Sequence, residues 1–352
     1  MLTTRISLAL AFPLALSGCA GLMIGNPADV LETIGGVERL DRAINALVPM
    51  DSRLEVVADG FDWSEGPLWI PEDGGYVIFS DIPPNRIIKW QSGKGASLYL
   101  NQSGYLGSIP RFNHVAPDEP GSNGLLLDLE GRLVLCQHGN RQVARMDADL
   151  DAPRPNYVPI ANAYQGKRLN SPNDAAYHEN GDLYFTDPPY GLAGKMGDPD
   201  KQLDFQGVYR VRPDGRVTLL TRQLSRPNGI AFSPDFETLY VANSDSKHAV
   251  WMAFPVKSDG TLGHGRVLFD ATTMVGKRRG VPDGLKVDQH GNLFATGPGG
   301  VLILSPDGRH LGTLLTGQAT SNCGFGDDGS TLYITADRYL VRIRLSTRGA
   351  GF

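Results

Sequence analysis

The sequence has few cysteines, no long basic run and none of the motifs that define several common enzyme folds. It contains three cysteines and carries a net charge of −5 over 352 residues. The absence of a G-x-S-x-G motif argues against a serine hydrolase of the α/β type, and the absence of P-loop and dinucleotide glycine motifs argues against nucleotide-binding folds. Without a basic run or a stripe of basic and aromatic residues, we expect no nucleic-acid partner.

Apolar residues at helical spacing are also scarce, whereas residues that form turns are abundant. The chain holds 43 glycines and 24 prolines. This combination favours many short strands joined by turns. We therefore expect an all-β protein, and a chain of this length can be a single unit if it is built from repeats.

The N-terminus differs in character from the rest of the chain. Arg5 precedes an apolar run over Ile6–Leu16 that is too short for a stable membrane span, and Leu16-Ser17-Gly18-Cys19 follows it. This ending resembles the lipobox of bacterial lipoproteins. It predicts a signal peptide over residues 1–18, lipidation of Cys19, and an outer-membrane anchor in the periplasm, since Ala20 is not the Asp that marks inner-membrane retention. The alternative is a cleaved signal with an incidental cysteine.

The mature chain is expected to have two parts. Residues 19–53 would form a tether with a short amphipathic helix over Val37–Val48, where apolar residues recur at helical spacing. Residues 54–352 would form the folded body. Cys136 and Cys323 lie in repeats that are not neighbours, so we expect two buried thiols, although the compartment would permit a disulfide.

Six short strings recur in phase along the body, and the second residue of each is an oxygen donor. Each string precedes an apolar run, a turn and a second apolar run, as expected for one structural unit repeated six times. Inward-pointing oxygens around a common axis are the ligands that a hard cation requires. The six donors are Glu65, Asn123, Asn173, Asn228, Asp283 and Asn322.

A plainer interpretation treats these strings as turns, because Asn-Gly and Asp-Gly pairs form turns on their own. It accounts for Asn123 or Asn228 taken singly. It does not account for Glu65, since glutamate is not a turn former, nor for polarity in all six strings.

The strands that follow each string predict a six-bladed β-propeller with four antiparallel strands in each blade. The sixth unit stops after its third strand, near Leu345, while Leu54–Ala58 has the pattern of a fourth strand. We expect this N-terminal strand to complete the last blade and close the ring, which removes a sheet edge.

Three inserts interrupt the repeat, over Gly104–Gly121, Pro188–Gln206 and Thr272–Val281. Long loops on a rigid scaffold often carry binding groups, so we expect at least the first two to wall the mouth over the polar strings. Asp187 ends a second strand, as Asp81 and Asn243 do in other repeats. A structural hydrogen bond common to the repeats is expected there.

Several of these strings together resemble the gluconolactonase and regucalcin-like family, in its bacterial gluconolactonase branch. The resemblance covers about residues 54–345. The strings are Glu65-Gly66-Pro67-Leu68-Trp69, Ser171-Pro172-Asn173-Asp174, Leu183-Tyr184-Phe185-Thr186-Asp187-Pro188, Arg226-Pro227-Asn228-Gly229-Ile230, Pro282-Asp283-Gly284-Leu285 and Leu135-Cys136-Gln137-His138-Gly139-Asn140-Arg141.

The resemblance implies a propeller that holds one divalent cation at the mouth of its central tunnel. The family's metal ligands correspond to Glu65, Asn173, Asn228 and Asp283. Asn123 and Asn322 occupy the same repeat position and, with His114 in the first insert, are candidates for substrate binding. Carboxylate and amide oxygens suit Ca²⁺ best, then Mg²⁺ or Mn²⁺, while the lack of His and Cys disfavours a classical zinc site; family members nevertheless accept more than one divalent ion, Zn²⁺ included.

The function that the resemblance implies is metal-dependent opening of sugar lactones, with the cation polarising the carbonyl for attack by water. Asp283 is the candidate to orient or deprotonate that water. Two alternatives stay open: phosphotriester hydrolysis at the same site, as in diisopropyl fluorophosphatase, and a non-catalytic scaffold of the cell envelope. The sequence gives no indication of oligomeric state.

Overall fold

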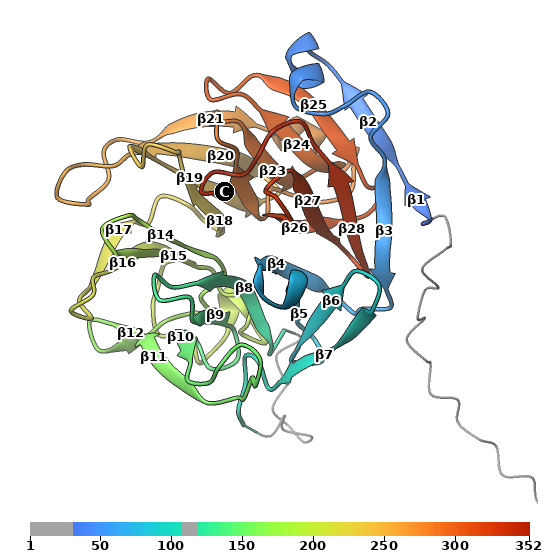
Figure 1. The fold of residues 1–352 in the computed structure, drawn as a ribbon. Coiled ribbons are helices and arrows are strands. Elements are labelled where there is room, and N and C mark those ends of the chain that lie inside the picture. Colours follow the sequence, from blue (N-terminus) through green and yellow to red (C-terminus); the bar gives the residue numbers. More distant parts are fainter. Residues whose placement is uncertain (1–30, 108–118) are drawn as a thin grey trace, which may run out of the picture.

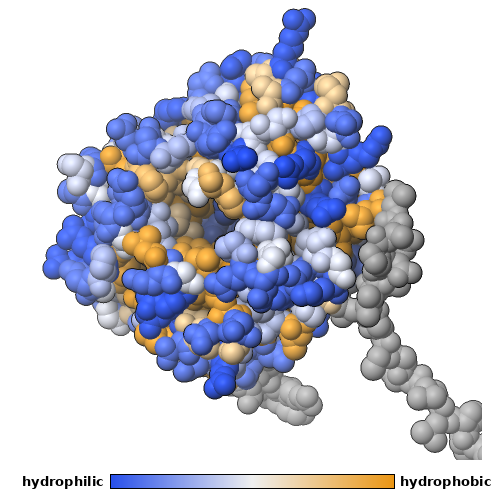
Figure 2. All heavy atoms as spheres, viewed as in Figure 1, coloured by the Kyte–Doolittle hydropathy of each residue, from blue (hydrophilic) through white to orange (hydrophobic). Residues whose placement is uncertain are grey.

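The computed structural model describes residues 31–107 and 119–352 as six β-sheets arranged around a central axis (Figure 1). The predicted signal peptide over residues 1–18, Cys19, the start of the tether and His114 lie outside the described residues. Within the described residues, no helix is both long and apolar enough to cross a membrane. Figure 2 shows a mostly hydrophilic face with a hollow at the centre of the ring.

Each of the six sheets contains a blade of four antiparallel strands, which confirms the predicted propeller; two of these sheets gain a fifth strand from the N-terminal segment, and a two-stranded ribbon is separate. Blade 1 contains β4 (Ser64–Ile70), β5 (Tyr76–Asp81), β6 (Arg86–Gln91) and β7 (Gly95–Asn101). Blade 2 contains β8 (Ser122–Leu127), β9 (Leu133–Gln137), β10 (Gln142–Met146) and β11 (Tyr157–Ala161), followed by a ribbon of β12 (Ala163–Tyr164) and β13 (Lys167–Arg168). Blade 3 contains β14 (Ala175–Tyr177), β15 (Leu183–Asp187), β16 (Gly207–Val211) and β17 (Val217–Thr221).

The second half of the chain repeats the same unit. Blade 4 contains β18 (Pro227–Phe232), β19 (Thr238–Asp245), β20 (His248–Pro255) and β21 (Arg266–Asp270). Blade 5 contains β22 (Leu285–Val287), β23 (Leu293–Gly297), β24 (Gly300–Leu304) and β25 (His310–Leu315). Blade 6 contains β26 (Thr320–Gly326), β27 (Thr331–Ala336), β28 (Tyr339–Arg344) and β3 (Leu54–Asp59).

The ring closes as predicted, through the N-terminal strand. β3 pairs antiparallel with β28, with Leu340 opposite Ala58 and Arg342 opposite Glu55. Blade 6 therefore combines the last three strands of the chain with an early one, and both ends of the propeller are held in a single sheet. Closure covers the edge of β28 that would otherwise be open to pairing with another chain.

The segment before β3 differs from the predicted amphipathic helix over residues 37–48. β1 (Thr33–Ile34) pairs with β3, and β2 (Gly36–Arg39) pairs with β25 as a fifth strand of blade 5. Only a short 3₁₀ helix, η1 (Arg42–Ala46), follows. The helix prediction was wrong over 37–39 because the open edge of β25 offers backbone hydrogen bonds to an adjacent segment, which a pattern of apolar residues does not reveal.

The apolar core is divided among the junctions between blades. Six clusters of buried side chains occur in the described part of the chain, and each combines residues of two neighbouring blades. At the junction of blades 1 and 6, Phe79 and Trp90 pack with Tyr333 and Leu340. Every blade is thus stabilised by burial on both of its faces, so no blade is independent of the ring.

Around the axis, the innermost strands are joined by hydrogen bonds at every junction. The N–H of Gly124 donates to the carbonyl of Asn173 (2.8 Å), and the Ser80 hydroxyl donates to the carbonyl of Asn123 (2.8 Å). The other junctions are bridged from Thr186 to Asn228, Gly229 to Asp283, Gly284 to Ser321 and Ser321 to Ser64.

This close approach explains the glycine that follows most of the polar positions. A Cβ on Gly66 would lie 2.3 Å from the carbonyl oxygen of Asn123, and one on Gly229 would lie 2.3 Å from that of Asp283. Distances this short are incompatible with any side chain, so these glycines allow backbone contact between blades. The polar residue before each glycine is therefore placed at the axis.

Two smaller predictions are confirmed. The side chains of Asp81, Asp187 and Asn243 each accept backbone N–H groups from the segment that leads into the first strand of their blade. Cys136 and Cys323 are free, buried thiols.

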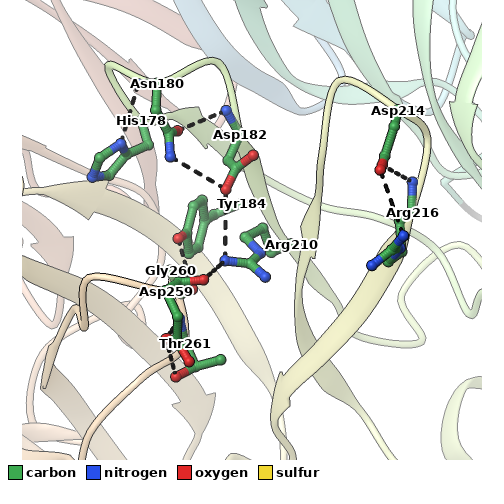
Figure 3. A network of polar contacts seen from close by, with 10 residues as sticks. All are labelled: His178, Asn180, Asp182, Tyr184, Arg210, Asp214, Arg216, Asp259, Gly260 and Thr261. Atoms are coloured by element: carbon green, nitrogen blue, oxygen red, sulfur yellow. Dashed lines mark hydrogen bonds and ion pairs between the residues drawn. The ribbon is translucent and has the colours of Figure 1, made fainter.

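A buried polar network joins blades 3 and 4 away from the axis (Figure 3). Arg210 of β16 is only 3% exposed, lies 3.6 Å from Asp182 and donates to the carbonyl of Asp259 in the loop between β20 and β21. Tyr184 donates to the carbonyl of Gly260 in the same loop (2.8 Å). These contacts fix that loop against blade 3, since breaking one would leave a buried charge unpaired.

Deletion of residues 1–59 should make the protein aggregate, because it removes β3 and exposes β28 as an open edge. Deletion of residues 1–32, which ends before β1, is the matched control and should leave a soluble monomer. Light scattering and size-exclusion chromatography of the two truncations would measure the difference. A soluble, monomeric and fully active chain lacking residues 1–59 would contradict this role for β3.

Candidate active site

A cavity of about 250 Å³ lies where the innermost strands converge. Five of the six predicted oxygen donors line it: Glu65, Asn123, Asn173, Asn228 and Asp283. Each begins or precedes the first strand of a different blade, and the hydrogen bonds between blades hold these positions around the axis. The structure therefore brings together the four predicted metal ligands and one of the predicted substrate contacts.

The inserts wall this cavity, as expected. Glu119 comes from the first insert, Tyr190 from the second and Val281 from the third. Arg226 adds an exposed cationic side chain to the lining, immediately before Pro227-Asn228. Sequence reasoning singled out none of these four residues, although Glu119 and Arg226 each lie within four positions of a polar string.

Asn322 has a different place from the other five donors. It is buried and does not line the cavity; its Nδ2 donates to Oε2 of Glu65 (3.1 Å), and its Oδ1 accepts from the N–H of Cys323 (2.9 Å). Oε2 of Glu65 also accepts from the N–H of Gly66 (2.7 Å). Asn322 thus orients the Glu65 carboxylate, and Oε1 of Glu65 accepts no hydrogen bond from the residues that the structure describes.

The amide side chains present their oxygens without partners. Oδ1 of Asn123 and Oδ1 of Asn173 are buried and have no hydrogen-bond partner among the described residues. Nδ2 of Asn228 donates to the Ser244 hydroxyl (2.9 Å), which fixes the orientation of that amide. Buried polar atoms normally have a partner, so unpaired oxygens at one site indicate a ligand that carries positive charge or donates hydrogen bonds.

The two carboxylates are held in an environment that disfavours their charge. Burial raises the pKa of Glu65 to about 8, against the effect of the Gly66 N–H. Burial also raises the pKa of Asp283 well above its ordinary value, and the nearby Glu65 carboxylate adds to that shift. A cation bound between them would reverse both effects.

The donor set therefore fits a divalent cation with oxygen ligands. Within the described ranges, no three His, Cys, Asp or Glu side chains cluster closely enough to hold a metal by themselves, so a cation at this site would need amide oxygens as further ligands. Two carboxylates with amide oxygens match Ca²⁺, Mg²⁺ or Mn²⁺ better than the nitrogen and sulfur sets typical of zinc.

Two other buried ionisable groups lie near the cavity. Burial raises the pKa of Asp174, whose Oδ1 accepts the N–H of Ala175 and whose Oδ2 has no partner among the described residues. Burial and the Lys195 charge lower the pKa of His138 to about 3, so its imidazole is neutral. Neither side chain lines the cavity.

A larger pocket of about 480 Å³ lies between blades 4 and 5, bordered by Asp235, His264 and His290. Its lining includes none of the six donors. Volume alone would favour this pocket, but ligand sites are distinguished by converging polar groups with perturbed pKa values. The buried carboxylates with raised pKa values and the unpartnered amide oxygens line the axial cavity and not this larger pocket.

Comparison with known proteins identifies the family of this chain. Residues 63–338 match the model of a protein family, the SMP-30/Gluconolactonase/LRE-like region. The chain belongs to this family.

Several relatives are similar to this chain over most of its length. A gluconolactonase of Zymomonas mobilis subsp. mobilis is 39% identical over 90% of this chain and 88% of its own length. The structure of a gluconolactonase from Xanthomonas campestris has a TM-score of 0.75 and 31% identity, covering 91% of this chain and 99% of that one. Regucalcin from Agrobacterium tumefaciens, with a TM-score of 0.63 and 19% identity over 84% of this chain and 96% of that one, shares the fold.

The raised pKa values predict opposite effects of pH with and without a cation. Since the folded-state pKa of Glu65 is raised, stability in EDTA should be greatest below about pH 4.5 and should decline as the pH rises towards about 8. Excess Ca²⁺ should remove this decline, because it binds the ionised carboxylates, so the melting temperatures with Ca²⁺ and with EDTA should diverge by several degrees at alkaline pH.

Thermal unfolding across this pH range, with EDTA and with Ca²⁺, would test that expectation. In Glu65→Gln the divergence should be much smaller, while a change of the exposed Glu179 to Gln should leave it as in the wild type. Equal melting temperatures with and without Ca²⁺ at every pH would mean that these carboxylates hold no cation.

Proposed function

We propose that this protein hydrolyses lactones of sugar acids with the help of one divalent cation held by Glu65, Asn173, Asn228 and Asp283. The observation that carries the proposal is the convergence of two buried carboxylates and unpartnered amide oxygens on the propeller axis. The 39% identity to a gluconolactonase over 90% of the chain supports the reaction class. The protein is a homologue of that enzyme and a lactonase.

The electrostatic balance of the cavity suits a neutral substrate. Two carboxylates around a dication leave the site close to neutral, so an uncharged lactone can enter without strong repulsion. A divalent cation bound there would polarise the lactone carbonyl and stabilise the negative charge that develops on its oxygen. Ca²⁺ is the best match, and it takes about six to eight oxygens, more than four side chains supply, so water and substrate can share the site.

The residues of the chain have separate tasks in this reaction. Asp283 accepts a proton from the attacking water, since it is an anionic side chain in the lining of the cavity where the cation would polarise the lactone carbonyl. Water adds to the carbonyl carbon, the ring C–O bond breaks, and the proton returns to the departing alkoxide to give the open hydroxy acid. Asn322 keeps Glu65 in place, and Oδ1 of Asn123 can accept from a substrate hydroxyl.

Replacement of Asp283 by Asn should lower kcat by at least about 100-fold, because the shape is kept while the anionic base is lost. Asp151→Asn, at an exposed position far from the cavity lining, is the matched control and should match the wild type. The assay is proton release from glucono-1,5-lactone, corrected for spontaneous opening.

Chelation separates the remaining interpretations. EDTA should abolish turnover without unfolding the protein, and added Ca²⁺ or Mn²⁺ should restore it. Full activity of Asp283→Asn would remove that residue from the mechanism. A cation-loaded protein that opens no lactone but hydrolyses a phosphotriester would support the second reaction, and inactivity on both would support the scaffold.

We also propose that the protein is anchored in the outer membrane through lipidated Cys19 and faces the periplasm. The support is the Leu16-Ser17-Gly18-Cys19 string alone. In a bacterial host, Cys19→Ala should move the protein from the membrane to the soluble fraction, with lactonase activity per molecule unchanged; Cys136→Ala serves as a control for loss of a cysteine. Continued membrane retention of Cys19→Ala would rule out this anchor.

A further inference from the structure

Glu119 is a cavity-lining carboxylate that the mechanism above does not use. It lies at the end of the first insert, on the wall of the cavity, and its side chain is 29% exposed. Its charge acts on the site, since it contributes to the raised pKa values of Glu65, Asp283 and Tyr190. Unlike Glu65 and Asp283, it does not belong to the repeated positions at the axis.

The backbone around Glu119 is fixed to blade 2. The N–H of His138 donates to the carbonyl of Gly121 (3.2 Å), and the N–H of Gly139 donates to the carbonyl of Pro120 (3.2 Å). These two bonds hold the residues that directly follow Glu119 against the end of β9. The position of its Cα therefore depends on the propeller framework.

Two basic side chains lie close to the Glu119 carboxylate, and Lys195 is the one that donates a hydrogen bond to it. Nζ of Lys195 lies 3.5 Å from Oε1, and Nδ1 of His138 lies 3.5 Å from Oε2. Lys195 donates in addition to the carbonyl of Tyr190, another residue of the cavity wall (2.6 Å). Because the His138 imidazole is neutral and fully buried, it adds no positive charge here, whereas Lys195 is a positive partner of this carboxylate.

We propose that Glu119 is a specificity residue that accepts hydrogen bonds from the ring hydroxyls of the substrate, so that the site selects polyhydroxylated lactones over unsubstituted ones. A carboxylate only accepts hydrogen bonds, and its two oxygens can receive two neighbouring hydroxyls. With the cation ligands at the axis and Glu119 on the wall, one end of a lactone is held by its carbonyl and the other by its hydroxyls. This inference rests on the proposed lactonase function.

Lys195 is a positioning residue in this arrangement. It joins the first insert to the second, since it contacts the Glu119 carboxylate and the Tyr190 carbonyl. Removing its ammonium group would free the Glu119 side chain to adopt other rotamers, at an entropic cost to the hydroxyl contacts. Its effect on specificity should therefore have the same sign as loss of Glu119 but be smaller.

The test compares kcat/KM for glucono-1,5-lactone with kcat/KM for δ-valerolactone, which has the same ring without hydroxyls. In Glu119→Gln the preference for gluconolactone should fall by roughly ten- to a hundredfold, as expected for loss of a charged hydrogen-bond acceptor, and mainly through KM. Lys195→Met should lower the preference less, and Glu179→Gln should leave it at the wild-type value. Ca²⁺-dependent thermal stabilisation of each variant would confirm that fold and cation site are intact.

Three results would overturn the inference. An equal loss of kcat on both lactones in Glu119→Gln would make this residue a general base. If Glu119→Gln kept the wild-type preference, or if the wild-type protein opened both lactones equally well, Glu119 would not select substrates by their hydroxyls. The proposed lactonase function would still stand in either case. A wild-type protein that opens neither lactone would overturn both proposals.

Discussion

The contact between neighbouring innermost strands is the constraint on which the rest of this structure depends. At each of the six junctions, a hydrogen bond crosses from one blade to the carbonyl of a residue in the next polar string. At positions such as Gly66 and Gly229 the backbones approach too closely for a Cβ. The preceding residue is therefore fixed at the axis, so the same contacts that close the ring also build the cavity.

The polar groups at the axis lower the stability of the folded protein. Glu65 and Asp283 are buried together with unpaired amide oxygens, and the pKa values of both are raised. Such a set is unfavourable unless positive charge enters, and replacing it with apolar groups would stabilise most folds. The six apolar cores between blades and the pairing of β3 with β28 stabilise the fold and offset the cost of burying these polar groups. Functional sites are the places where polar and charged side chains are expected to be buried against the usual preference for apolar residues.

The sequence predicted the repeating parts residue by residue, whereas of the inserts it predicted only that they would wall the mouth and not which side chains would line the cavity. The phase of the strings was sufficient for the six blades, for closure by Leu54–Ala58 and for the convergence of Glu65, Asn173, Asn228 and Asp283, because equivalent positions in a repeat have equivalent surroundings. The helix expected over 37–48 was wrong over 37–39, since the free edge of β25 is a property of the assembled fold. Asn322 shares the pattern, but its side chain donates a hydrogen bond to Glu65 and does not line the cavity. The spacing of residues along the sequence does not specify in which direction a side chain points.

The side chains that the inserts bring to the cavity are harder to predict from the sequence, because an insert has no equivalent position in another repeat with which it can be compared. Glu119 and Tyr190 come from loops whose sequences carry no periodic signal. Contacts such as those of Lys195 with both residues help to hold them at the cavity wall. The axis and the wall are thus under separate constraints. A change in the backbone at the axis would disturb both the contacts between blades and the proposed cation ligands, whereas a change in an insert would alter the wall and leave both intact. In this fold, substrate preference can therefore diverge through the inserts while the residues at the axis, and the reaction they support, stay the same.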